Sequence, residues 1–297
     1  MELCLGTVQF GMKYGLNQKQ QPPLDYCIKC LDYATQNGVL AIDTAAAYGN
    51  AEQIVGYFLS KKTISRDKLF ISTKMLPNSL DGIQPEQYVS VIKTHLEQSL
   101  QRLHTDYVDA FLFHSSRYAF QPQMIEALRT VQTKGFARKI GISIYDPDEA
   151  LACASNPSIN IIQAPYSVFD HRLKNSNALC ALEQANIEVH VRSTFLQGLI
   201  LMEEDAIPIH LADAKPTIHK VEALCKKAGI SRVALAIAYV KKERGISRLV
   251  FGIHSMEQLQ ENITLFRKGV SEDILAEAEV LFADLPISIV IPSLWKK

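Results

Sequence analysis

Residues 39–56, VLAIDTAAAYGNAEQIVG, combine a strand, a polar loop and the start of a helix. The run Val39–Ile42 is short and apolar, which is typical of a strand buried on both faces. Asp43 follows this strand directly, Tyr48 lies in the next loop, and Asn50 is an N-cap residue that predicts the start of a helix. An acid and a phenol are therefore expected near the carboxyl end of one buried strand.

Two further apolar runs end in a polar side chain. Lys74 follows the run at 69–73, and His114 follows the run at 107–113. An acid after a strand is often only a turn residue, and a loop tyrosine often only covers the core. Asp43, Tyr48, Lys74 and His114 together, at the ends of three successive strands, favour a functional site over these structural explanations.

Short apolar runs alternate with helical patterns along the chain. Strands are expected at 3–7, 39–43, 69–73, 107–113, 139–143, 159–164, 187–193 and 249–252. Helices are expected at 24–37, 51–59, 85–103, 122–134, from 146 onward, at 177–186, 217–242 and 256–267. The helical region 217–242 is expected to break at 228–230. An extra helix near 271–282 and a tail ending in Trp295 follow.

Eight strand–helix units predict an α/β fold, a (β/α)8 TIM barrel with an extra C-terminal helix and tail, forming a single domain over residues 1–297. An open, doubly wound sheet is the alternative. Such a sheet usually carries a G-x-G-x-x-G loop after its first strand, and residues 6–11 lack that spacing. In a barrel the active site lies at the carboxyl ends of the strands, so the four polar side chains are expected to converge on one rim.

Composition limits the classes of partner. Thirty-one basic residues balance thirty-one acidic ones, which gives no indication of a nucleic-acid or anionic-membrane partner and favours a small-molecule substrate. The sequence shows neither a signal peptide nor an apolar run of about 20 residues, and its six scattered cysteines need no disulfide framework, so we expect a cytoplasmic protein. Cys27 and Cys30 form a C-x-x-C pair, but their place in an amphipathic helix favours packing, and no metal site is expected.

The four polar groups suit proton transfer to a forming alkoxide. A free tyrosine has a pKa of about 10, and an adjacent ammonium such as that of Lys74 lowers it. Asp43 would keep Lys74 charged, and His114 would donate a hydrogen bond to a carbonyl oxygen or share the proton with Tyr48. Carbonyl reduction also needs a hydride, which only a cofactor supplies.

The sequence resembles the aldo-keto reductase family from Gly6 to about Asn262. The motifs that carry the resemblance are LGTVQFG (5–11), IDTA (42–45), YGNAE (48–52) with Gly56, STK (72–74), DAFLFH (109–114), GIS (141–143), IQAPY (162–166) and EN (261–262). The resemblance implies a barrel that binds NADPH in an extended form, with Tyr48 as general acid, Lys74 and Asp43 tuning it, and His114 orienting the substrate carbonyl.

The resemblance also implies a set of cofactor contacts. Ser143 and Gln163 would hold the nicotinamide carboxamide, Ser193 and the loop through Gln197 and Gly198 the pyrophosphate, and Glu261 and Asn262 the adenine. Four positions depart from the family's common pattern. Ile144 stands where an asparagine often follows the serine, Arg192 stands where an aromatic residue often stacks on the nicotinamide, and Gly252 and Gln258 stand where many members place a Lys and Arg clamp for the 2′-phosphate. A guanidinium plane can also stack, so the nicotinamide is still expected to bind, with altered geometry. Other branches of the family also carry Gly at the position of Gly252, so the resemblance makes NADPH the first expectation and NADH the alternative.

The expected reaction is reduction of an aldehyde or ketone to an alcohol, or the reverse. Arg117 and Tyr118, in the short loop after His114, hint at a polar substrate such as a sugar or sugar derivative. The family's common state predicts a monomer. Two other functions stay open: a cofactor-binding regulatory subunit of the same fold with little turnover, and a barrel enzyme of different chemistry in which Asp43 and Lys74 form only a structural ion pair.

Overall fold

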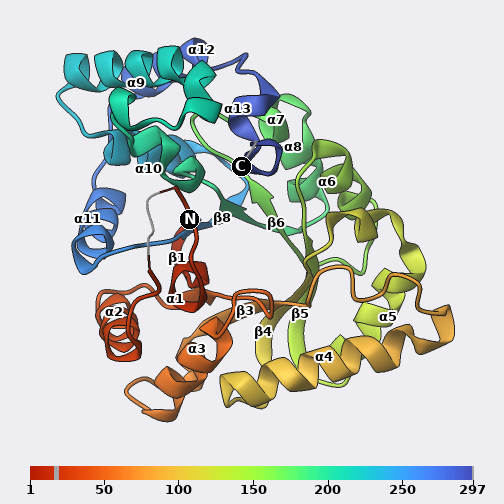
Figure 1. Ribbon diagram of the computed structural model, residues 1–297. Helices are drawn as coiled ribbons and strands as arrows, with labels where there is room; N and C mark the ends of the chain where they lie inside the picture. The colour runs from red at the N-terminus through yellow and green to blue at the C-terminus, as the bar shows by residue number, and fades with distance from the viewer. Residues whose placement is uncertain (17–19, 296–297) are drawn as a thin grey trace.

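The computed structural model describes residues 1–16 and 20–295 of the chain. Eight parallel strands pair in sequential order, and β8 pairs back onto β1 to close a barrel surrounded by helices (Figure 1). The strands are β1 (Glu2–Gly6), β2 (Ala41–Asp43), β3 (Phe70–Lys74), β4 (Val108–Phe113), β5 (Ala137–Ser143), β6 (Ile161–Pro165), β7 (Glu188–Arg192) and β8 (Ile246–Phe251). The predicted (β/α)8 barrel is confirmed.

The predicted helices are present in the expected order, together with three helices of four residues each that the sequence analysis did not predict. They are α1 (Val8–Gly11), α2 (Leu24–Gln36), α3 (Ala51–Ser60), α4 (Tyr88–Leu103), α5 (Pro122–Thr133), α6 (Pro147–Ala154), α7 (Arg172–Asn175), α8 (Ala178–Gln184), α9 (Lys215–Ala228), α10 (Arg232–Lys242), α11 (Met256–Arg267), α12 (Glu272–Leu281) and α13 (Ile287–Val290). The predicted break between α9 and α10 is present: Gly229 adopts a left-handed conformation (φ 65°), and the Ser231 hydroxyl accepts a hydrogen bond from the Ala234 amide as the N-cap of α10.

The bounds of β8 differ from the prediction. The strand begins at Ile246 rather than Leu249, because Arg248 lies in the ladder and pairs with Glu2 (2.8 Å) and Glu188 (3.5 Å). A charged side chain interrupts the apolar pattern from which strands are recognised. Here it is paired with acids of the neighbouring strands β1 and β7, so the ladder continues through it.

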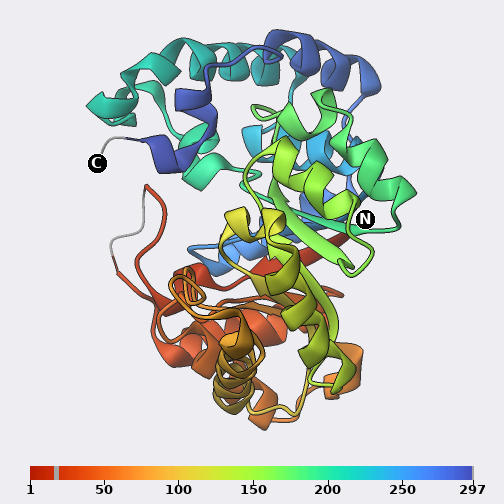
Figure 2. The same cartoon turned by 90° about the vertical axis from the view of Figure 1, so that its right-hand side faces the viewer.

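The N-terminus and the C-terminal helix α13 lie on opposite sides of the barrel (Figure 2). β1 begins at Glu2, so the N-terminus marks the side of the amino ends of the strands. The C-terminal segment, with α13, lies on the other side, where the strands end. The extra helix α12 packs against α9 and α10 on the outside of the ring. The rim formed by the strand ends is therefore the place to look for the predicted site.

Candidate active site

Asp43 ends β2, whose three residues are all buried and pair with Phe70–Ser72 of β3. Its carboxylate accepts hydrogen bonds from Ser72 Oγ at 2.9 Å, from Gln163 Nε2 at 2.8 Å and from Lys74 Nζ at 2.8 and 2.7 Å. Donors from β3 and β6 thus converge on one acid inside the barrel. The predicted pairing of Asp43 with Lys74 is present.

Lys74 is fully buried at the end of β3. Its ammonium also donates to the Thr44 carbonyl at 3.0 Å and to the Tyr48 hydroxyl at 3.4 Å. Burial by itself lowers the pKa of this lysine, but Asp43 and Tyr48 outweigh it and raise the pKa above its usual value. Lys74 is therefore a charged donor that links Asp43 to Tyr48.

The Tyr48 phenol differs from the sequence-based expectation. Lys74 does act to lower its pKa, but burial is the larger effect and, with Asp43, raises the pKa above the ordinary value. The expected lowered pKa is therefore wrong for the free protein, because a sequence cannot give the degree of burial. The phenol is protonated at neutral pH, as a proton donor must be.

His114 lies beside Tyr48, with ring centroids 5.7 Å apart in an edge-to-face arrangement. Burial lowers the pKa of its imidazole to about 3, with Lys74 and Arg192 acting in the same direction. The ring is therefore neutral at physiological pH, and its buried Nδ1 atom has no hydrogen-bond partner among the described residues. A neutral imidazole at this place can donate one hydrogen bond to an oxygen that approaches Tyr48.

The loop that carries Tyr48 is held by close backbone packing. A Cβ atom on Gly11 would lie 1.7 Å from the Tyr48 carbonyl oxygen, and one on Gly49 would lie 2.2 Å from the Gly11 carbonyl oxygen. Gly49 also has a positive φ of 56°. Asn50 precedes α3 as predicted, but its side chain does not cap the helix and instead accepts a hydrogen bond from Gln21. The loop is thus fixed by α1 and by the segment before α2.

Glu52, in the first turn of α3, is buried. Its carboxylate accepts hydrogen bonds from Thr73 Oγ1 at 2.6 Å and from Arg102 Nε at 2.6 Å. Thr73 lies between Ser72 and Lys74 on β3. Glu52 therefore ties the helix that follows Tyr48 to the strand that carries Lys74.

A cavity of about 380 Å³ opens at this rim, which is a volume in the usual range for ligand sites. Most of the predicted site residues line it: Asp43, Tyr48, Gln163, Arg192, Ser193, Gln197, Gly198, Gly252, Gln258, Glu261 and Asn262. Three further predicted residues are adjacent to the cavity. Lys74 and His114 contact Tyr48, and Ser143 on β5 is paired in the sheet with Gln163 on β6. Residues from β2 to α11 are thus brought to one cavity.

The cavity also includes residues that the sequence analysis did not assign to the site. Thr7 and Gln9 lie in the segment after β1, and Tyr14 lies in the following loop. The LGTVQFG motif marks the first two, whereas no pattern marks Tyr14. Thr194 is buried in the cavity wall, and its hydroxyl has no hydrogen-bond partner among the described residues.

The loop after β7 has an unusual backbone. Ser193, Leu196 and Gln197 adopt positive φ angles of 66°, 48° and 54°, and Gly198 follows at 97°. Such conformations are costly for residues other than glycine and cluster at ligand sites. With the free Thr194 hydroxyl, this loop offers polar groups to an anionic ligand in the cavity.

The far end of the cavity is formed by the segment from Gly252 into α11. The Gln258 side chain accepts a hydrogen bond from the His254 amide at 2.8 Å, and the Ser255 hydroxyl caps α11. Glu261 and Asn262 lie one turn further on. Among the described residues that line this end, none is a lysine or arginine.

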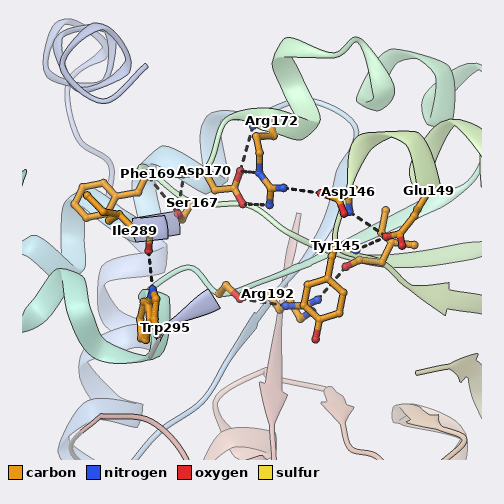
Figure 3. A network of polar contacts seen from close by, with 12 residues as sticks. Tyr145, Asp146, Glu149, Ser167, Phe169, Asp170, Arg172, Arg192, Ile289 and Trp295 are labelled. Atoms are coloured by element: carbon orange, nitrogen blue, oxygen red, sulfur yellow. Dashed lines mark hydrogen bonds and ion pairs between the residues drawn. The ribbon is translucent and has the colours of Figure 1, made fainter. Parts of the chain in front are cut away.

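Arg192 ends β7 at the other end of the cavity. Its guanidinium donates to the Ile144 carbonyl at 2.9 Å and stacks 4.4 Å from the ring centroid of Tyr145. Figure 3 shows the two side chains together, beside the network in which Arg172 binds Asp146 and Asp170. The predicted planar cation is present at the cavity wall.

Other residues singled out in the sequence lie outside the cavity. The Tyr118 ring is buried, its hydroxyl donates to Asp81 at 2.9 Å, and Arg117 also binds Asp81, so the hint that these two residues read a substrate is not supported. Trp295 donates to the Ile289 carbonyl at 3.2 Å (Figure 3).

The C-x-x-C pair serves helix packing. Burial raises the pKa of the thiols of Cys27 and Cys30 to about 12 and about 11, and both side chains are fully enclosed in the core beneath α2. Within residues 1–16 and 20–295, no cluster of three His, Cys, Asp or Glu side chains is arranged to hold a metal ion. No helix in the same part of the chain has the length and apolar character needed to cross a membrane.

The fold and site define a barrel enzyme with a Tyr, Lys and Asp constellation at a cavity on the rim of the strand ends. The model of the aldo/keto reductase family matches residues 2–280. The chain belongs to this family of oxidoreductases.

Characterised relatives share moderate identity with the chain. D-arabinose 1-dehydrogenase of Saccharomyces cerevisiae is 28% identical over 276 residues, covering 87% of this chain and 80% of the relative. NADH-specific methylglyoxal reductase of Escherichia coli is 27% identical over 277 residues, covering 83% and 84%. The crystal structure of a thermostable aldo-keto reductase with the inhibitor epalrestat superposes with a TM-score of 0.72 at 22% identity, covering 94% of each chain, which supports the fold.

Proposed function

We propose that the chain reduces a small aldehyde or ketone to an alcohol, or catalyses the reverse oxidation, with a nicotinamide cofactor and with Tyr48 as general acid and base. The observation that carries the proposal is the hydrogen-bonded series from Asp43 through Lys74 to the Tyr48 hydroxyl, which opens into the cavity. Relatives that act on D-arabinose and on methylglyoxal support small carbonyl compounds and sugars as the substrate class.

The residues of the cavity fit a nicotinamide dinucleotide. The unpartnered Thr194 hydroxyl and the Ser193–Gly198 backbone would hold the pyrophosphate, Ser143 and Gln163 the carboxamide, and Glu261 and Asn262 the adenine. When bound, the cofactor supplies the hydride that no side chain can provide. Tyr48 then transfers its proton to the substrate oxygen, and the charged Lys74 stabilises the phenolate that remains.

His114 would position the substrate carbonyl. Its imidazole is neutral, so it donates a hydrogen bond to the oxygen without competing with Tyr48 as an acid. Two neutral donors then meet on the oxygen that gains negative charge during reduction.

The first experiment follows NADPH oxidation with a reactive aromatic aldehyde, methylglyoxal and a panel of aldoses. We expect turnover by the wild type and a loss of about 10²–10⁴-fold in kcat for Tyr48→Phe, with cofactor binding retained. Equal activity of the two proteins would contradict the role of Tyr48. Tight cofactor binding without turnover of any substrate would instead favour the regulatory subunit.

We also propose NADPH as the cofactor, bound at least as tightly as NADH. The proposal rests on the resemblance to the family. At the start of α11 the Met256 amide already donates to the Tyr26 hydroxyl and the Gln258 amide to the Ser255 hydroxyl, and no basic clamp is present among the described residues of that end of the cavity. The preference is therefore expected to be small. A fluorescence titration with both cofactors tests it, and tighter binding of NADH would overturn the proposal.

A further inference from the structure

Arg192 is held at the reaction end of the cavity by uncharged partners. The guanidinium donates to the Ile144 carbonyl at 2.9 Å and to the Ser193 hydroxyl at 3.4 Å, and it lies over the Tyr145 ring (Figure 3). The Tyr145 backbone is fixed in turn, because its amide donates to Glu149 at 2.7 Å in the N-terminal turn of α6. The position of the guanidinium is therefore well defined without an acidic partner.

The charge of Arg192 is not neutralised by an ion pair. Among the described residues, no carboxylate lies within 4.0 Å of its guanidinium. Asp146 and Asp170 in the adjacent network both bind Arg172, and Asp43 binds Lys74. An arginine remains charged at any working pH, so the cavity wall carries an uncompensated cation next to the catalytic groups.

The field of this cation reaches the reacting groups. Arg192 acts to lower the pKa of both Tyr48 and His114, as a nearby positive charge must. The hydride donor has to approach a carbonyl whose oxygen lies at the Tyr48 hydroxyl. A nicotinamide ring in that place is exposed to the same field.

We infer that Arg192 makes the site bind the reduced nicotinamide cofactor more tightly than the oxidised one. This inference rests on the proposed function. The reduced ring is neutral, whereas the oxidised ring carries a positive charge that the guanidinium repels in a site of low dielectric constant. The phosphates are the same in both redox forms, so their contribution cancels when the two affinities are compared.

The preference has a consequence for the direction of the reaction. A site that binds the reduced form more tightly raises the reduction potential of the bound cofactor. The same site binds the oxidised form of the cofactor less tightly. Carbonyl reduction is then followed by ready release of the oxidised cofactor. In the direction of alcohol oxidation the same guanidinium would oppose binding of the cofactor that must enter first.

The test compares dissociation constants rather than activity. NADPH and NADP⁺ are titrated by calorimetry against the wild type, Arg192→Met, which removes the charge at similar length, and Arg192→Lys, which keeps the charge. In the wild type the Kd of NADP⁺ should exceed that of NADPH by about tenfold or more. The methionine variant should bring the ratio close to one, and the lysine variant should keep most of it.

Each outcome is decisive. A ratio that Arg192→Met leaves unchanged, or a wild-type ratio near one, overturns the inference while leaving the proposed function intact. Failure of the wild type to bind either NADPH or NADH overturns the proposed function itself. Should the methionine variant not fold, Arg192→Gln provides an uncharged polar replacement for the same comparison.

Discussion

Replacing Lys74 with methionine leaves the Asp43 carboxylate buried without its charged partner. Lys74 Nζ and Asp43 Oδ2 are 2.7 Å apart, and both side chains are almost completely buried. At an effective dielectric constant of about 20, two unit charges at this distance attract by roughly 6 kcal/mol. Asp43 keeps the hydrogen bonds from Ser72 and Gln163, so we expect a net loss of about 3–5 kcal/mol in the free energy of unfolding.

A double-mutant cycle isolates the pair. Asp43→Asn alone should cost a similar amount, because it leaves a buried ammonium, whereas the double variant leaves no charge and should cost clearly less than the two single changes added together. Urea unfolding followed by circular dichroism at pH 7 measures the three values. Lys139→Met is the matched control, since Lys139 pairs with Glu188 at 2.6 Å in the same barrel but is partly exposed, and about 1 kcal/mol is expected. Additivity within about 0.5 kcal/mol would refute the reasoning.

Two further predictions concern the position of Tyr48 and the charge of His114. Gly11→Ala and Gly56→Ala both drive a Cβ atom against a backbone oxygen, at 1.7 and 2.1 Å, and both should destabilise the protein by about 1–3 kcal/mol. Of these two glycines, Gly11 lies against the Tyr48 carbonyl and Gly56 does not. The Gly11 variant should therefore also lose about 10²-fold in kcat/KM under conditions where both variants are folded. Equal losses of kcat/KM in the two variants would count against this role of Gly11. The imidazole of His114, with a pKa of about 3, is neutral at pH values well above 3, so kcat/KM for reduction should show no ionisation of this ring near pH 6.5. An ionisation in that range which His114→Gln removes would show that the ring is charged in the free enzyme.

The barrel and the convergence of Asp43, Tyr48, Lys74 and His114 could be predicted because the relevant signals are local in sequence, whereas the cofactor-binding residues were expected only from the family resemblance. The apolar runs of β2 and β3 end in Asp43 and Lys74, and His114 directly follows that of β4. The parallel strands of a barrel bring these ends to one rim. Asp43 and Lys74 are predictable as a pair for a further reason, since a buried charge needs an opposite charge. These arguments need only the order of residues along the chain.

The rest depends on the closed geometry. Gln163 is 120 residues from Asp43 in sequence, yet it donates to this carboxylate across the inside of the barrel. The pKa of Tyr48 is raised rather than lowered because the degree of burial decides between two opposing effects. Arg248 continues β8 because acids on β1 and β7 neutralise it, and neither acid is near it in sequence. No local sequence pattern shows which side chains pair across a barrel.

The charges around Tyr48 explain how the site stabilises the transition state more than the ground state. Lys74 and Asp43 form a pair without net charge, the Tyr48 phenol is protonated, and the His114 imidazole is neutral. On the proposed mechanism the two groups that bond to the substrate carbonyl oxygen, Tyr48 and His114, are both neutral and bind its partial negative charge weakly. The oxygen becomes an alkoxide as hydride arrives, and the same donors, with Lys74 behind Tyr48, then stabilise a full negative charge. Interactions that strengthen only as this charge develops lower the barrier rather than merely holding the substrate, which is what catalysis requires of them.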